Sequence, residues 1–114
     1  MKTPPMIAYN PNPYQGEANY VKRDKDLEAA ILNCLTNVGE MKLMLFYSSC
    51  QYMKDYRPAE KTIRDYVNMS HDCFSRNRNN LQEKGWITID KGILTINYEK
   101  IYDDYMRKVL SKDA

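Results

Sequence analysis

One stretch largely determines the fold, PAEKTIRDYVNMSHDCFSRNRNNLQEKGWITIDKGILTIN, which runs from Pro58 to Asn97. It has the pattern of two short helices followed by a β-hairpin. The first helix is expected to open at Pro58, because the fixed φ angle and missing N–H of proline fit a first helical turn. Glu60 then lies favourably near the positive end of the helix dipole. The expected buried stripe of this helix consists of Ala59, Ile63, Tyr66 and Val67.

A second helix is predicted from His71 to Lys84. Ser70 is a good N-cap for it, since its hydroxyl can accept from the free N–H groups of the first turn. Gly85 can adopt the left-handed conformation that ends a helix. At 100° per residue, the side expected to be buried carries Phe74, Asn77 and Leu81. The opposite side carries Asp72, Arg76, Asn79 and Glu83, and Ser75 and Asn80 flank it.

The pattern changes to that of strands after Gly85. Residues 86–89 and 93–97 are rich in β-branched side chains, and Asp90, Lys91 and Gly92 lie between them. β-branched runs on both sides of a turn that contains glycine are a strong signal for a hairpin. We therefore expect a hairpin over residues 86–97.

Residues 58–89 resemble the winged helix-turn-helix domains of phage and plasmid replication initiators, replisome-organiser proteins and small regulators of low-GC Gram-positive bacteria. The matching positions are Pro58, Thr62, Ile63, Met69, Ser70, Phe74, Leu81, Gly85, Trp86 and Ile87. Two positions depart from the pattern: Ala59 stands where the family often has a capping serine, and Arg78 where it often has an apolar residue. We expect the stem of Arg78 to pack at the edge of the buried face, with its guanidinium outside. The resemblance implies a recognition helix at about 71–84 and a short wing at about 86–97.

The predicted fold class is mainly α with a small β-hairpin, a winged helix-turn-helix with an extra N-terminal arm and a C-terminal helix. Residues 1–16 hold four of the five prolines and are expected to form an extended or disordered arm. The domain is predicted to span residues 17–110, and residues 111–114 to form a frayed tail.

Further elements are predicted on both sides of the central stretch. Residues 18–23 have the pattern of a short strand, and apolar residues recur from Leu27 to Leu35 at helical spacing. The next helix, about Glu40 to Met53, is apolar nearly all round and is expected to be the central core helix. Asn37 has the spacing of a cap for it, with Glu40 three residues later. After the hairpin, a last helical stripe consists of Tyr98, Ile101, Tyr102, Tyr105, Val109 and Leu110.

Composition limits the possible functions. A charged fraction of 28% and a formal charge of +2 are ordinary, so DNA binding would have to depend on local charge. Three cysteines without paired spacing, and no signal sequence or long apolar run, favour a reducing cytoplasm and no membrane partner. The resemblance implies that this is the cytoplasm of a bacterium or of a phage-infected host cell. The sequence His71-Asp72-Cys73 lacks the second histidine or C-x-x-C pair of a metal site. With no catalytic arrangement and no glycine-rich phosphate loop either, we expect no enzyme activity, no metal and no cofactor.

Two functions from different classes remain. The first is a sequence-specific protein that binds double-stranded DNA, a phage- or plasmid-type transcription regulator or replication initiation factor. The residues predicted to contact DNA are Arg57, Lys61, Ser70, His71, Ser75, Arg76, Asn79, Asn80 and Lys91. The second is a winged-helix protein-interaction module, such as a phage-encoded inhibitor or adaptor, that acts through its tyrosine-rich last helix. Its interface with a second copy or another protein would contain Tyr98, Tyr102 and Tyr105.

Overall fold

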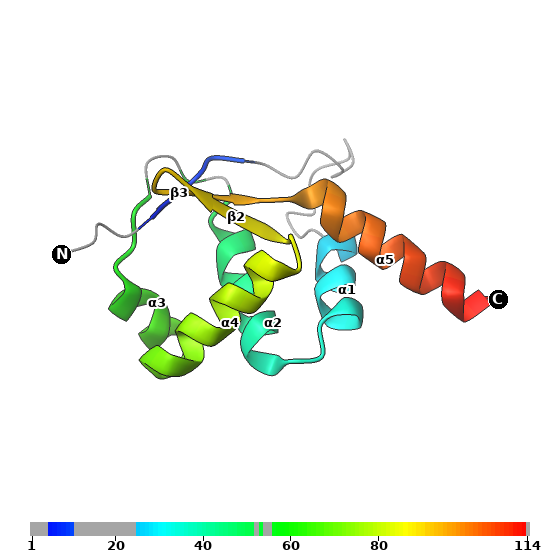
Figure 1. The fold of residues 1–114 in the computed structure, drawn as a ribbon, viewed down its shortest axis with the longest axis horizontal. Coiled ribbons are helices and arrows are strands. Elements are labelled where there is room, and N and C mark those ends of the chain that lie inside the picture. Colours follow the sequence, from blue (N-terminus) through cyan, green and yellow to red (C-terminus); the bar gives the residue numbers. More distant parts are fainter. Residues whose placement is uncertain (1–4, 11–24, 52, 54–55, 114) are drawn as a thin grey trace.

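Helices dominate the structure, a computed structural model that describes residues 5–10, 25–51, 53 and 56–113, without the side chains of 25, 26 and 110–113. The elements, in chain order, are β1 (Met6–Ile7), α1 (Lys25–Cys34), α2 (Val38–Ser49), α3 (Glu60–Val67), α4 (His71–Glu83), β2 (Ile87–Asp90), β3 (Ile93–Ile96) and α5 (Tyr98–Asp113). The strands form one sheet in the order β1-β3-β2. In Figure 1 the sheet runs above α2, α3 and α4, and α5 extends away from it beside α1. The predicted class, mainly α with a small β component, is confirmed.

Helix α3 is anchored by two buried residues four positions apart, Ile63 and Val67. Its end is set by Asn68, whose φ of 54° places it in the left-handed region. The prediction of a wider stripe was wrong, because Ala59 is exposed and the side chain of Tyr66 is 73% exposed. The ring of Tyr66 meets the ring of Phe46 at 61°, with 5.3 Å between the centroids.

Helix α4 has the buried face that its sequence predicts, with Phe74, Asn77 and Leu81 all buried. The Ser70 hydroxyl accepts from the backbone N–H of Cys73 at 3.2 Å and caps the helix. Gly85 has a φ of 78° and lets the chain turn from α4 into the first hairpin strand. These signals are local, which explains why both ends of α4 could be predicted.

The hairpin has a two-residue turn, Lys91-Gly92, and both residues have positive φ, 52° and 76°. Positive φ at both central positions is the mark of a type I′ turn, whose twist matches that of the strands. The register pairs Ile87 with Ile96 at the open end and Asp90 with Ile93 at the turn. Trp86, immediately before the hairpin, is 1% exposed and belongs to the core.

Strand β1 comes from the predicted N-terminal arm, and the third strand was not predicted. It pairs parallel to β3, with Met6 opposite Ile93, and Ile7 also bridges to Tyr56. Ile7 is 2% exposed, so this part of the arm contributes to the core. Residues 1–4 and 11–16 of the arm, and the strand predicted at 18–23, lie outside the described residues.

Helix α2 is shorter than the predicted span of 40–53, and one part of its surface is open. Ser48 and Ser49 donate their hydroxyls to the carbonyls of Leu45 and Phe46, which competes with helix continuation near Cys50. Its apolar residues Leu43, Met44, Phe46 and Tyr47 are buried, whereas Leu45 is 43% exposed. The helix is central and covered on most sides, as expected for a helix that is apolar nearly all round, and its exposed residues, Val38, Lys42, Leu45 and Ser49, share one side.

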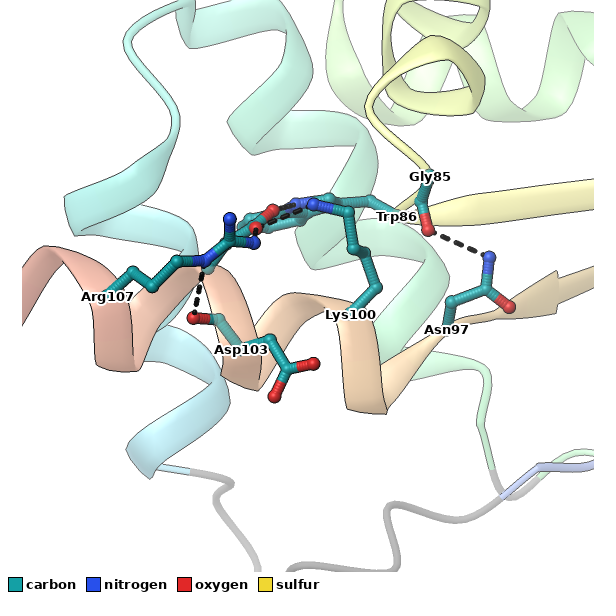
Figure 2. A network of polar contacts seen from close by, with 7 residues as sticks. Gly85, Trp86, Asn97, Lys100, Asp103 and Arg107 are labelled. Carbon is teal, nitrogen blue, oxygen red and sulfur yellow. Dashed lines mark hydrogen bonds and ion pairs between the residues drawn. The ribbon is translucent and has the colours of Figure 1, made fainter.

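Helix α5 is joined to the start of the hairpin by a polar cluster around Asp104. Figure 2 shows the Asp104 partners Trp86, Lys100 and Arg107 close together. The indole of Trp86 donates to Oδ2 of this carboxylate, while Lys100 at 2.6 Å and Arg107 at 2.5 Å contact Oδ1. Nearby, the side-chain amide of Asn97 donates to the carbonyl of Gly85 at 2.9 Å. The helical backbone continues through Asp113, into the segment predicted to fray.

Candidate nucleic-acid interface

The outward face of α4 presents exposed polar side chains. Burial of Phe74 and Leu81 turns this helix so that Arg76 and Asn79 are both exposed. Neither has a hydrogen bond or ion pair with any other described residue, so both are available to a partner. The acidic residues Asp72 and Glu83 are also exposed, one near each end of the helix. The face therefore offers donors and acceptors with little net charge.

The residues predicted to meet phosphates are all at the surface. Lys61 is paired with Asp65 at 2.8 Å, and the two side chains are 77% and 67% exposed. Lys91 occupies the tip of the hairpin and is exposed without an ion pair among the described residues. Arg57 is exposed just before α3. Because the charge of Lys61 is offset by its neighbour, Lys91 is the clearer candidate for a phosphate contact.

Three polar side chains, Glu60 and Arg64 of α3 and His71 of α4, connect the two helices. Nδ1 of His71 lies 2.5 Å from Oε2 of Glu60, and the same oxygen is 3.4 Å from Nε of Arg64. His71 is 61% exposed at its side chain. Ser70 is exposed too, but its hydroxyl caps α4. Ser70 is the N-cap of α4 and His71 is its first residue, so both lie at the start of the helix.

Two other predicted contact residues, Ser75 and Asn80, are half-buried. The amide of Asn80 donates to Oε2 of Glu40 at 3.4 Å, across to α2, so this side chain is partly engaged inside the protein. Glu40 is 3% exposed and forms an ion pair of 2.8 Å with Lys84. The sequence indicated a capping role for Glu40, and only Asn37 fills that role, by accepting from the N–H groups of Gly39 and Glu40.

The tyrosines of α5 face the protein's own core. Tyr98 is 4% exposed, and its hydroxyl lies 2.7 Å from the carbonyl oxygen of Asn10 and 3.0 Å from Oε1 of Gln51. Tyr102 and Tyr105 are half-buried and pack against the core. In this arrangement Tyr98 is not accessible to a partner, because burial and its polar contacts fix it inside. Among the described side chains of α5, Met106 is apolar and exposed, at 52%.

The described residues hold little else that suggests chemistry. Among them no three histidine, cysteine or acidic side chains gather as they would around a metal ion. Cys34, Cys50 and Cys73 are free thiols, and burial raises the pKa of Cys34 and of Cys50. None of the described helices combines the length and the apolar character needed to cross a membrane.

No family model, curated protein sequence or solved structure matches this chain significantly.

Proposed function

We propose that this protein binds double-stranded DNA as a winged helix-turn-helix, with α4 as the recognition helix and the β2–β3 hairpin as the wing. The order of elements supports this, since α3 and α4 are joined by a three-residue turn, 68–70, and the hairpin follows directly. The bridge between Ile7 and Tyr56 adds a short extended segment before α3. In this class of domain the second helix enters the major groove with its N-terminal residues at the base edges.

The observation that carries the proposal is the exposure of Arg76 and Asn79 on the face of α4 opposite Phe74 and Leu81. Arginine pairs with O6 and N7 of guanine, and asparagine with N6 and N7 of adenine. Each good pair provides about 1–3 kcal/mol of discrimination between bases. Both side chains are free of internal partners among the described residues, so no internal contact has to be broken.

Charge on this face predicts the balance between specific and non-specific binding. Asp72 and Glu83 repel phosphates, and Asp65 offsets Lys61. Non-specific affinity depends mainly on phosphate contacts. We therefore expect weak binding to random DNA, with specificity that comes from the base contacts of α4. The family resemblance supports a role as a regulator or replication initiation factor of the phage or plasmid type.

The test is fluorescence polarisation with a duplex selected from a random pool and with random duplex, across a salt series. Arg76→Ala and Asn79→Ala should each weaken binding to the selected site and leave random-duplex binding largely unchanged. Lys42→Ala, on the exposed side of α2, serves as the control for loss of one charge. If the wild type shows no salt-sensitive duplex binding, or if both α4 residues can be removed without effect, the proposal is wrong.

The alternative of an interaction module through α5 has less support, because Tyr98 is buried and the other two tyrosines pack inward. Analytical ultracentrifugation in the same buffer distinguishes the two functions. A protein that fails to bind duplex but sediments as a dimer would favour the interaction module.

A further inference from the structure

A pocket of about 430 Å³ lies between β1, the helix pair α3–α4 and the hairpin. Its wall is largely apolar and includes Ile7, Ile63, Phe74 and Leu94, which come from four different elements. All four are buried residues of the hydrophobic core. Ligand pockets in proteins typically have volumes of about 300–1,000 Å³ and mostly apolar walls with a few placed polar groups. This pocket has the size and the lining of such a site.

One cation in the wall lacks an anionic partner. Arg78 is half-buried, with its guanidinium carbon 5.2 Å from the centre of the Phe74 ring. Its Nε is buried and has no hydrogen-bond acceptor, in contrast to the expectation that the guanidinium lies outside. No carboxylate among the described residues pairs with it. A buried donor on a charged group without an acceptor is costly, and an anion in the pocket would remove that cost.

Tyr47 supplies a second polar group to the same wall. It is 1% exposed, and no hydrogen bond joins its hydroxyl to another described residue. Burial raises the pKa of this phenol, while the positive charge of Arg78 acts in the opposite direction. Tyr47 therefore stays protonated near neutral pH and keeps an O–H donor beside the Arg78 charge.

The acidic group of the pocket is already engaged. Glu60 lines the rim together with His71, but its carboxylate contacts both His71 and Arg64. A cationic ligand would compete with these contacts and would also meet the charge of Arg78. The electrostatics of the pocket favour an anion over a cation.

We propose that this pocket binds a small organic carboxylate with an apolar body, its carboxylate at Arg78 and Tyr47 and its body against Ile7, Ile63, Phe74 and Leu94. A cavity of about 150 Å³ holds benzene, so this one accommodates a ring, a short chain and a carboxylate. The assignment does not depend on DNA binding, because Arg76 and Asn79, which carry that proposal, are not part of the wall, although the predicted contact residues His71 and Ser75 are.

The first experiment uses the wild-type protein and three probes of similar size that differ in the charge of the end group. Calorimetric titration and ¹H–¹⁵N spectra are recorded with 3-phenylpropionate, 3-phenylpropionamide and 3-phenylpropylamine. The carboxylate should bind with shifts at the amides of Ile7, Ile63, Phe74 and Leu94, and at least about 10-fold more tightly than the amide or the amine. Equal binding of the three probes, shifts confined to other surfaces, or no binding at millimolar concentration would overturn the assignment.

The second experiment assigns the anion contact to its residues. Arg78→Gln should weaken binding of the carboxylate by about 10- to 100-fold and leave the affinity for the amide nearly unchanged, while Arg78→Lys should restore part of the loss. Tyr47→Phe should give a smaller loss. Lys42→Gln removes one exposed positive charge from α2 and is the matched control. If Lys42→Gln weakens binding as much as Arg78→Gln, the anion is held by overall charge and the Arg78 site is excluded.

Discussion

Trp86 and Asp104 are joined by a hydrogen bond of 2.8 Å from the indole Nε1 to Oδ2, across 18 residues of sequence. Trp86 follows the turn that ends α4, immediately before β2, and Asp104 lies in the middle of α5. The side chain of Asp104 is 22% exposed and also forms ion pairs with Lys100 and Arg107, two of the side chains drawn in Figure 2. One carboxylate thus holds the start of the hairpin and the last helix together.

The stability that Asp104 contributes should depend on pH in a defined way. Burial alone would raise the pKa of this carboxyl, but the hydrogen bonds from Lys100 and Trp86 outweigh it, and the pKa is lowered. The ionised form therefore stabilises the fold above the unfolded pKa, about 3.9, and this contribution is lost as pH falls through the lower, folded value. Asp104→Asn should cost about 1–2 kcal/mol at pH 7, and the gap to wild type should narrow below about pH 4.

The measurement is thermal denaturation by circular dichroism from pH 2 to 7. The matched control is Asp103→Asn, next to it on α5, since the Asp103 side chain is exposed. A gap between wild type and Asp104→Asn that stays constant down to pH 2 would contradict the proposed role of the charge.

Trp86 should contribute through packing more than through its hydrogen bond. The side chain is 1% exposed among core residues, so Trp86→Ala is expected to cost roughly 3–5 kcal/mol, enough to unfold many small domains. Trp86→Phe keeps most of the packing and loses the N–H donor, and should cost about 1–2 kcal/mol less than Trp86→Ala. Urea denaturation of both variants measures the difference, and an unchanged midpoint for Trp86→Ala would disprove this placement.

A close approach between α2 and α4 gives a third prediction. A Cβ atom on Gly39 would lie 2.1 Å from Nδ2 of Asn77, which is 1% exposed. Gly39→Ala should therefore cost about 1–3 kcal/mol through overpacking, although alanine is the better helix former by about 1 kcal/mol.

The control for Gly39→Ala is the same change in an Asn77→Ala background, where the obstructing side chain is gone. There the substitution should be neutral or stabilising by up to about 1 kcal/mol. Denaturant unfolding of the four proteins completes a double-mutant cycle. Equal destabilisation in both backgrounds would show that the contact with Asn77 is not the cause.

The elements that depend on local signals could be predicted from the sequence, and those that depend on distant contacts could not. Ser70, Gly85 and the Lys91-Gly92 turn act within a few residues, so α4 and the hairpin were found with nearly correct ends. Strand β1 has only two residues in a proline-rich segment, and it forms because Ile7 fits between Tyr56 and Leu94.

The candidate site also has a part that could be predicted from the sequence and a part that could not. Helical periodicity identified Arg76 and Asn79 as outward, because Phe74 and Leu81 specify the opposite face. Periodicity could not reveal that the Glu40 side chain would form an ion pair with Lys84, 44 residues later in the sequence, instead of capping α2. Nor could it reveal that Glu40 would accept a hydrogen bond from Asn80. The pocket at Arg78 was also beyond prediction, since five elements separated in sequence, β1, α2, α3, α4 and β3, form its wall.

The last prediction concerns the tip of the proposed wing. Lys91 has a φ of 52° and is followed by Gly92, so Lys91→Asn removes the charge and creates an Asn-Gly pair, the preferred sequence for this turn. The hairpin should keep its stability, and any loss of DNA binding then reports the charge alone. If Lys91 contacts a phosphate, the slope of log affinity against log salt should become less steep by about 0.9, with equal weakening on selected and random duplexes. Lys42→Asn, on α2, is the control for charge. An unchanged slope for Lys91→Asn, together with impaired binding by Arg76→Ala, would place the hairpin tip away from the DNA and leave α4 as the contacting element.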